Sequence, residues 1–420
     1  MMKVLMLLNF FPPEIGSGPH LPFELGETLV QRGCQVTVMT GFPQYNLPAM
    51  PENYRGKFFC REEMSGVTVL RARSTPYGKG RISRGLFHFL APSTLALRAL
   101  FQEPPDVVYT YTPPLPMGIA ARCVASHLGV PCVVHVQDLF PQNVIDLGML
   151  RNRMMIRFFE AMERRTYRMA DAIVVMSEGN VDHVVARGAP RDKIRAVSNW
   201  VDTDLIKPGE RMNGFRRTHQ IGQEFVVLFA GTMGWSQGLE VVIEAARRLA
   251  AEPGLLFLLV GSGVKREELE HQAVGLPNVR FLPMQSKDVY PHVLAASDAC
   301  LVTLPPEVAT PAVPSKIATI MAAGRPILAC LPRGDASRLI EESEGGLVVA
   351  AGAADALASA ILDLKRQPLL AERLGLNGRE FAVRSLSRAS CVGDIEETMR
   401  ALVKTNVHVT DDHSELARSP

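Results

Sequence analysis

Net charge and long apolar runs are both nearly absent from this sequence. Its 420 residues include 45 basic and 43 acidic side chains, and a formal charge of +2 gives no overall attraction to nucleic acid. No stretch reaches about 18 apolar residues, the length that a membrane-spanning helix needs. The apolar start, MMKVLMLLNFF, is short and runs into Pro12 and Pro13, so it indicates a first strand rather than an export signal.

Paired cysteines are absent as well. The seven cysteines stand singly, without a C-x-x-C pair and without the spacing of metal ligands. Scattered thiols suit a reducing compartment, where disulfides do not persist. We therefore expect a cytoplasmic protein.

Apolar runs of strand length alternate with segments of helical period along most of the chain. Runs such as KVLMLLN, QVTVMTG and CVVHVQD are rich in valine, as strands covered on both faces are. The alternation starts again after residue 200 with FVVLFAG and LFLLVGSG. With 47% apolar residues, the pattern predicts an α/β fold of two doubly wound, Rossmann-like domains, each with its own core.

The stretch VSNWVDTDLIKPGERMNG, rich in Asn, Asp, Pro and Gly, marks the break between the domains. We predict an N-terminal domain at residues 1–199 and a C-terminal domain at residues 200–385. The two are expected to face each other across a cleft at the carboxyl ends of their strands. The polar tail 405–420 shows no periodicity and is expected to be disordered.

Glycines follow several of the predicted strands. NFFPPEIGSGPH follows the first strand, and AGTMGWSQG and VGSGVKREEL follow two strands of the second domain and open helices. Backbone amides at such turns favour a phosphate. None of these loops matches G-x-x-x-x-G-K-[ST] or G-x-G-x-x-G, which disfavours a P-loop ATPase and an NAD-dependent dehydrogenase.

The stretch VPSKIATIMAAGRPILA places Ser315 and Lys316 at the start of an apolar helix. A hydroxyl donor, a compact cation and free helix N–H groups converge there, as in a diphosphate clamp. The alternative is that Lys316 only solvates the first turn. We favour the clamp, because a lysine at this end of a helix opposes the helix dipole.

Several motifs, in this order, resemble the retaining GT-B glycosyltransferases of family 4, and most of all the branch that builds bacterial capsule, O-antigen and exopolysaccharide repeat units. The resemblance implies that the C-terminal domain binds a nucleotide sugar, usually a UDP-sugar, and that the N-terminal domain binds the acceptor. It implies transfer with retention and without a bound metal, and a helix within residues 386–404 that crosses back to the first domain. It rests on GSGPHLPFELGETLVQRGCQVTVMTGFP, VQDLFPQNVIDLG, NWVDTDLIKP, FAGTMGWSQGLEVVIEAARRL, LLVGSGVKREELE, NVRFLP and VPSKIATIMAAGRPILA.

Matched position by position, the family's donor site falls in the second domain. The resemblance implies that Ser315 and Lys316 contact the diphosphate and that the backbone after Phe281 holds the base. The donor residues implied in this way are Gly231, Thr232, Gly261, Gly263, Leu282, Met284, Pro314, Ser315 and Lys316.

Three positions depart from the family's pattern. Gln237 stands where many relatives place a lysine, which removes one positive charge from the donor site. Thr319 and Pro311 stand where the family typically has glutamates near the ribose, and Glu307 is the nearest carboxylate. A ribose diol without a charged acceptor loses on the order of 1 to 3 kcal/mol, so these departures predict altered donor affinity or base preference.

Asp138 ends the predicted strand CVVHVQD, which points its carboxylate at the cleft. There it can orient the acceptor hydroxyl or stabilise a developing oxocarbenium charge, so we assign catalysis to Asp138 and Lys316. The alternative for Asp138 is a helix N-cap. His135 suits a satisfied core histidine at least as well as a catalytic one. Acceptor contacts are expected at Gly16, Gly18 and His20.

The Asp202 to Asp204 stretch has the D-x-D spacing that metal-dependent glycosyltransferases of another fold use. It lies in the segment between the domains, where turn formation explains the aspartates. We therefore expect no metal site. No cofactor is expected either, since the nucleotide sugar is a substrate.

Two segments join basic residues to apolar ones. YGKGRISRGLFHFLAPSTLALRALF carries Lys79, Arg81 and Arg84, and LRNRMMIRFFEAMERRTYRM holds six arginines against two glutamates. Each can lie on an anionic leaflet or bury its apolar face in a core. The family's frequent use of polyprenyl-diphosphate-linked acceptors favours peripheral contact with the inner face of the plasma membrane.

The sequence thus predicts a metal-independent, retaining glycosyltransferase of the hexosyl or N-acetylhexosaminyl type. It would move a sugar from a nucleotide diphosphate, with UDP as the expected nucleotide, to a lipid-linked or glycan acceptor in lipopolysaccharide or related polysaccharide synthesis. A nucleotide-sugar 2-epimerase of the same fold is one alternative. A non-catalytic, GT-B-like subunit that binds membrane and nucleotide is the other, and Pro311 and Thr319 are its best support.

Overall fold

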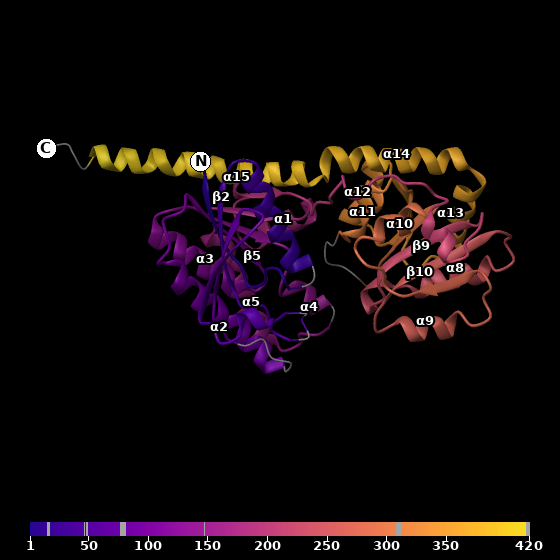
Figure 1. The fold of residues 1–420 in the computed structure, drawn as a ribbon, viewed down its shortest axis with the longest axis horizontal. Helices are drawn as coiled ribbons and strands as arrows, with labels where there is room; N and C mark the ends of the chain where they lie inside the picture. The colour runs from indigo at the N-terminus through magenta and orange to yellow at the C-terminus, as the bar shows by residue number, and fades with distance from the viewer. Residues whose placement is uncertain are drawn as a thin grey trace. The chain divides into compact units, whose positions relative to one another are not determined.

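The computed structural model describes residues 1–14, 17–45, 47, 49–75, 81–146, 148–307 and 313–416. The chain divides into two compact units (Figure 1). Unit 1 comprises Met1–Ser198 together with Val392–Pro420, and unit 2 comprises Asn199–Cys391. The first crossing between the units falls at Ser198 and Asn199, inside the polar stretch that the sequence marks as a break.

Unit 1 is built on an eight-stranded sheet in the order β3-β4-β2-β1-β5-β6-β7-β8. All neighbouring strands run parallel except β3 and β4, which are antiparallel. The strands are β1 (Lys3–Leu7), β2 (Gln35–Gly41), β3 (Phe59–Met64), β4 (Val67–Ala72), β5 (Val107–Thr112), β6 (Cys132–Val136), β7 (Ala172–Val175) and β8 (Ile194–Ala196).

Helices cover both faces of this sheet, so its central strands are buried on both sides, as their continuous apolar runs predicted. The first helix ends just before Gly33, whose φ of 85° suits the position after a helix. The helices are α1 (Ser17–Gln31), α2 (Arg81–Ala99), α3 (Leu115–Leu128), α4 (Gln142–Asp146), α5 (Arg153–Met169) and α6 (Glu178–Ala186).

Unit 2 holds a fully parallel six-stranded sheet in the order β11-β10-β9-β12-β13-β14. The chain winds outward from β9 to β11 and then crosses to β12 on the other side of β9. Ligands of such sheets bind at the carboxyl edge where the order reverses. The strands are β9 (Phe225–Thr232), β10 (Leu255–Ser262), β11 (Val279–Leu282), β12 (Ala299–Thr303), β13 (Ile327–Leu331) and β14 (Gly346–Ala350).

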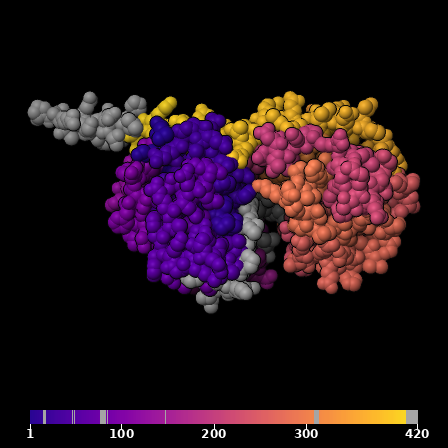
Figure 2. All heavy atoms as spheres, viewed as in Figure 1, coloured from indigo at the N-terminus to yellow at the C-terminus, as the bar shows by residue number. Residues whose placement is uncertain are grey.

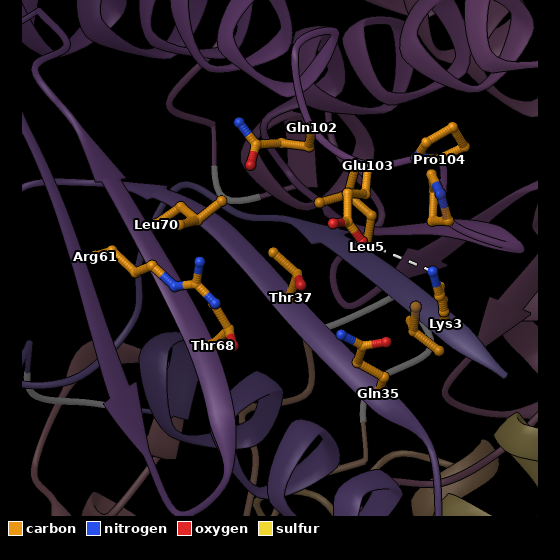
Figure 3. Close-up of a pocket in the computed structure, with 12 residues that line it drawn as sticks. Lys3, Leu5, Gln35, Thr37, Arg61, Thr68, Leu70, Gln102, Glu103 and Pro104 are labelled. Carbon is orange, nitrogen blue, oxygen red and sulfur yellow. Dashed lines mark ion pairs between the residues drawn. The ribbon is translucent and has the colours of Figure 1, made fainter. Parts of the chain in front are cut away.

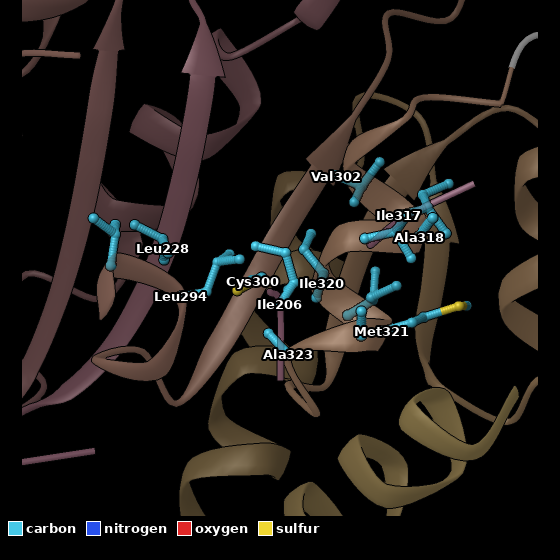
Figure 4. Packing of buried hydrophobic residues seen from close by; sticks show 14 of the residues in the cluster. Ile206, Leu228, Leu294, Cys300, Val302, Ile317, Ala318, Ile320, Met321 and Ala323 are labelled. Carbon is cyan, nitrogen blue, oxygen red and sulfur yellow. The ribbon is translucent and has the colours of Figure 1, made fainter. Parts of the chain in front are cut away.

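One apolar cluster lies on each face of the unit 2 sheet. In the cluster of Figure 4, Ile317, Ile320 and Met321 of the helix that follows β12 lie together with strand residues such as Cys300 and Val302. This packing fixes the helix that carries Lys316. The helices of unit 2 are α7 (Gly214–Thr218), α8 (Glu240–Arg248), α9 (Arg266–Gln272), α10 (Tyr290–Ala295), α11 (Lys316–Ala322), α12 (Asp335–Glu342), α13 (Ala354–Arg366) and α14 (Pro368–Ser385).

The last helix, α15 (Arg388–Leu416), begins in unit 2 and belongs to unit 1 from Val392 onward. There the Glu396 carboxylate accepts hydrogen bonds from Arg32 and from Arg400. In Figure 2 the yellow atoms of this helix lie against the indigo surface of unit 1.

The backbone of α15 is helical through Leu416, so this helix continues into residues 405–416 of the polar tail. Extending a helix that already exists needs no new nucleation, and this stretch contains neither glycine nor proline to stop it. Residues 417–420 of the predicted tail lie outside the described residues.

Candidate functional site

Lys316 is the first residue of α11, at the carboxyl edge of the unit 2 sheet. Its Nζ lies 3.9 Å from the centroid of the Phe229 ring and donates a hydrogen bond to Gln237 Oε1 at 2.8 Å. Burial lowers the pKa of the Lys316 amino group to about 7. The amino group therefore has neutral partners in the described chain and can take an anionic one.

Gln237, which replaces the lysine of many relatives, is the hydrogen-bond partner of Lys316. It ends a short 3-10 turn, Trp235–Gln237, and its carbonyl accepts a hydrogen bond from Thr303 Oγ1 at 2.5 Å. The next residue, Gly238, has a φ of 57°, and a Cβ there would lie 3.0 Å from the backbone nitrogen of Pro305. The first glycine loop is thus fixed against the end of β12, which places Gln237 beside Lys316.

The glycines of the two loops allow the loops to pack closely against each other. A Cβ on Gly261 would lie 1.9 Å from the Gly231 carbonyl oxygen, and a Cβ on Gly263 would lie 2.3 Å from that of Met233. A Cβ on Gly231 would meet Lys316 Nζ at 3.6 Å, so the backbone of Gly231 lies close to the amino group. The sequence indicated approach to a ligand at these glycines, and the structure adds contact between two strand ends.

We expect Gly261→Ala to destabilise the protein by about 3 kcal/mol, because the new Cβ overlaps backbone that cannot move aside cheaply. Gly234→Ala is the matched control in the same loops, since a Cβ there meets nothing within 4 Å. Chemical unfolding of both variants measures the difference. Equal stabilities would show that the loops are not packed in this way.

Arg266, which the sequence analysis did not single out, joins the ends of β10 and β11. Its Nη1 donates hydrogen bonds to the carbonyl oxygens of Gly261 at 2.5 Å and Leu282 at 2.9 Å. Leu282 is one of the residues where we expect the base to rest, and Met284, the other, is exposed. Its position in the sequence could have indicated this role, because Arg266 directly follows the second glycine loop and is the first residue of α9.

The remaining residues of the predicted donor site are spread around α11. Ser315 precedes the helix without forming a side-chain cap, so the helix does not use its hydroxyl. The Thr319 hydroxyl donates a hydrogen bond to the Ser315 carbonyl oxygen at 3.3 Å. The hydroxyl oxygen can therefore only accept a hydrogen bond from a ligand. Thr232 and Glu307 are exposed, Pro314 is half-buried, and Pro311 lies outside the described residues.

A second cation near the first glycine loop is already paired. Lys265 Nζ lies 2.8 Å from Glu240 Oε1 and 2.6 Å from Glu268 Oε1, and 4.2 Å from the centroid of the Trp235 ring. Trp235 is 70% exposed, so the other face of its indole is open to solvent. Neither residue was predicted from the sequence, although WSQG and VKREE lie beside the glycines.

In unit 1, Asp138 lies two residues after β6. It is exposed, yet the protein around the carboxyl desolvates it and raises its pKa. The next helix, α4, begins at Gln142, too far along the chain for Asp138 to be its N-cap. The N-cap alternative is therefore wrong, and the carboxylate remains available at the carboxyl edge of the sheet.

His135 is a satisfied core histidine. Its ring stacks on Tyr111 with 4.7 Å between centroids, its Nδ1 lies 2.6 Å from the Tyr109 hydroxyl, and Gln137 Nε2 donates to its Nε2 at 2.9 Å. Burial lowers the pKa of His135 to about 3, so the ring is neutral at physiological pH. A proton-shuttle role is not supported.

The predicted acceptor residues lie at the start of α1. His20 Nε2 is 4.0 Å from Glu24 Oε1, and Gly18 is exposed with open space where a Cβ would be. Gly16 lies outside the described residues. The structure brings neither His20 nor Gly18 into contact with Asp138.

Buried polar atoms without hydrogen-bond partners gather where the strands of unit 1 end. Both amide atoms of Asn9 and the hydroxyl oxygens of Thr40, Ser74 and Thr112 have no partner in the described part of the chain. They lie at or just beyond the ends of β1, β2, β4 and β5. Since buried polar groups are normally hydrogen-bonded, these four residues are candidates for a polar ligand or water. None of the four was predicted from the sequence, although each follows or ends an apolar run.

The cavity of Figure 3 lies at the opposite, amino edge of the same sheet. It is lined by residues that begin strands, including Lys3, Gln35 and Thr68, and Lys3 Nζ lies 3.7 Å from Glu103 Oε2. Among the predicted site residues that the structure describes, none lines this cavity.

Asp202 forms a turn, as we expected. Its Oδ1 accepts hydrogen bonds from the backbone nitrogens of Asp204 at 3.1 Å and Leu205 at 2.9 Å. Within residues 1–416, apart from the gaps given above, no group of three or more His, Cys, Asp and Glu side chains is placed to hold a metal ion. None of the described helices combines the length and hydropathy needed to cross a bilayer.

Both units match families of known proteins. The Glycosyl transferase 4-like domain matches residues 21–200, and Glycosyl transferases group 1 matches residues 224–367. The chain is 28% identical over 401 residues to the putative colanic acid biosynthesis glycosyl transferase WcaI of Escherichia coli (strain K12), an alignment that covers 92% of this chain and 97% of WcaI. It is 30% identical over 250 residues to the probable glycosyltransferase WbjE of Pseudomonas aeruginosa, covering 57% of this chain and 60% of WbjE.

Among solved structures, Anabaena Alr3699/HepE in complex with UDP has the same fold. The TM-score is 0.70, with 18% identity over 96% of this chain and 100% of the other. Two Rossmann-like halves with parallel sheets are therefore the architecture of both proteins.

Proposed function

Because this chain belongs to the GT-B glycosyltransferases of family 4, we propose that it transfers a sugar from a nucleotide diphosphate, with UDP as the expected nucleotide. The observation that carries this proposal is the amino group of Lys316, which has only neutral partners among the described residues and lies next to the backbone of Gly231. HepE was solved with UDP and also with UDP-glucose, which supports the choice of nucleotide.

In this proposal Lys316 neutralises the diphosphate as it leaves the sugar. A cation held in a partly desolvated site stabilises such charge more than one in water does, which lets the chain act without a metal ion. Arg266 holds the ends of β10 and β11, where the base is expected to rest near Leu282. The sugar type, hexosyl or N-acetylhexosaminyl, and transfer with retention belong to the proposal.

We propose a lipid-linked or growing glycan acceptor in the synthesis of cell-surface polysaccharide. The names of WcaI and of the lipopolysaccharide core biosynthesis glycosyltransferase LpsE of Rhizobium meliloti support this class. Asp138 would orient the acceptor hydroxyl, and the orphaned polar groups of Asn9, Thr40, Ser74 and Thr112 would supply acceptor contacts. The protein would work at the cytoplasmic face of the membrane, as a peripheral protein.

A non-catalytic, nucleotide-binding subunit is the second candidate. It is favoured by one observation, the hydrogen bond from the Thr319 hydroxyl back to Ser315, at the position where the family typically places a glutamate. Such a subunit would bind a nucleotide without releasing UDP from its sugar.

We expect UDP and UDP-sugars to raise the melting temperature, with and without a chelator. A ligand at 100 times its Kd stabilises the folded state by about 2.7 kcal/mol, which a thermal-shift assay detects easily. Lys316→Met should abolish most of this shift. If no nucleotide diphosphate stabilised the protein, the donor site proposed here would be wrong.

UDP release then separates the remaining functions. Release that requires an acceptor indicates transfer, release without any acceptor indicates an epimerase or hydrolase, and binding without release indicates the non-catalytic subunit.

A further inference from the structure

The exposed face of α2 is apolar. Leu86, Leu90 and Leu97 recur at i, i+4 and i+11 and are 51%, 44% and 60% exposed. The opposite face, with Phe87 and Leu95, is buried in the core of unit 1. The helix therefore already contributes one apolar face to the core. Its second apolar face points outward, so burial in the core does not explain it.

The neighbouring helix α5 has its polarity inverted. Its buried residues are Glu163, Thr166 and Tyr167, whereas Met154 and Phe158 are 76% and 47% exposed. A helix of a soluble protein normally buries its apolar stripe and exposes its polar face. The outward apolar side chains of α5 thus need a partner that is not in this chain's core.

The two stripes join into one surface. The Phe89 ring of α2 lies 6.2 Å from the Phe158 ring and 6.3 Å from the Phe159 ring of α5, measured between centroids. Figure 1 shows α2 and α5 beside each other in unit 1. The sequence presented them as two separate amphipathic segments, about 70 residues apart, and the fold makes them neighbours.

This surface is positively charged because the glutamates of α5 form ion pairs with other residues of the protein. Glu160 pairs with Arg187 at 3.1 Å, and Glu163 with Arg187 at 3.0 Å and with His183 at 2.8 Å. In the described chain, no ion pair involves the exposed arginines of α5, which are Arg153, Arg157, Arg165 and Arg168.

We propose that α2 and α5 form a docking surface for an anionic membrane. Apolar side chains inserted at the headgroup boundary, surrounded by arginines that meet lipid phosphates, are the two features of interfacial helices, and both are present here. We call it the α2–α5 surface; it comprises Leu86, Leu90, Leu97, Met154, Phe158, Arg153, Arg157 and Arg165. The inference gives the proposed peripheral contact a place on the molecule and depends on no step of the transfer reaction.

The buried face of α2 contacts the segment that follows β1. Phe87, on the buried face of α2, stacks on Phe10 with 5.8 Å between ring centroids, and Phe10 follows the orphaned Asn9. A membrane bound at α2–α5 would therefore lie one helix thickness from these polar groups, which suits an acceptor whose lipid part stays in the bilayer.

The test is co-sedimentation of the full chain with vesicles, without donor or acceptor. We expect binding to vesicles of phosphatidylcholine with phosphatidylglycerol at low ionic strength and little binding to pure phosphatidylcholine. Leu90→Gln with Phe158→Gln should lower the partition constant at least about tenfold, as should Arg157→Glu with Arg165→Glu. All four side chains are outside the buried core, and circular dichroism would check that the variants fold.

Matched controls lie in unit 2. Val274→Gln with Leu369→Gln removes two apolar side chains that are 77% and 81% exposed, and Arg373→Glu with Arg384→Glu makes the same change of charge. Both controls should bind as the unmodified chain does. The proposal is overturned if the unmodified chain ignores anionic vesicles, if controls and α2–α5 variants lose binding equally, or if light scattering shows that the surface joins two copies of the chain instead.

Discussion

Replacing Lys316 with alanine should lower kcat/KM for sugar transfer by about 100- to 1,000-fold, the loss found when one preorganised donor to a developing negative charge is removed. The effect is expected to be large because Lys316 is the cation nearest the backbone of Gly231, while Lys265 is held by Glu240 and Glu268. A steady-state assay with a UDP-sugar measures it.

Lys316→Met tests whether the loss of activity comes from the missing charge, because this variant should stay folded. Lys316 is a partly buried amine whose charged form is disfavoured, and Met keeps most of the length of the side chain while removing the cost of burying a charge. The matched control is Lys207→Ala, which removes an exposed lysine of the same unit and should leave transfer unchanged. Unchanged turnover in Lys316→Ala would remove the residue from the mechanism, whatever the melting temperature.

Donor affinity should fall as the pH rises through 7. The pKa of Lys316 is lowered to about 7 in the free protein, and a bound diphosphate favours the charged amine, so binding takes up a proton. The apparent Kd should therefore rise about tenfold between pH 6 and pH 8 and stop rising above the pKa of the complex. A nucleotide sugar is the right ligand, since its diphosphate does not titrate in this range as the terminal phosphate of UDP does.

Isothermal titration calorimetry in two buffers of different ionisation enthalpy counts the protons. Near pH 8 we expect uptake of about one proton per donor in the unmodified chain and none in Lys316→Met. The stability of the donor-free protein should change with pH in the opposite direction to its affinity for the donor. Above pH 7 the unfolded chain binds one more proton than the native one, so without donor the free energy of unfolding should rise with pH up to about 10.5. Donor binding that did not depend on pH would contradict this account of Lys316.

Strands buried on both faces were the part of the fold that sequence could predict. A strand such as β6 must be apolar on both sides, and CVVHV is visible as a continuous run. The β3–β4 hairpin was missed because β3, FCREEM, is half-exposed and lacks such a run. Its signal was the turn, where Ser65 and Gly66 both have positive φ, as in the two-residue turns that join antiparallel strands.

The donor site was predicted as residue types but not as contacts. Lys316 was singled out because a lysine at the start of a helix opposes the helix dipole. Its partner Gln237 lies 79 positions away and meets it only because β9 and β12 are adjacent in the sheet. The close contact of Gly261 with Gly231 likewise depends on the register of β9 and β10, which apolar periodicity does not specify.

In α15, the order of synthesis differs from the order of assembly. The first 198 residues of unit 1 leave the ribosome long before Val392, Ile395 and Met399, which are fully buried and complete that unit. All of unit 2 is made in between. Until α15 has been made, a nascent chain therefore exposes the surface of unit 1 that α15 covers, and Arg32 lacks its partner Glu396. A frameshift or nonsense codon near residue 390 would consequently damage the domain that was translated first.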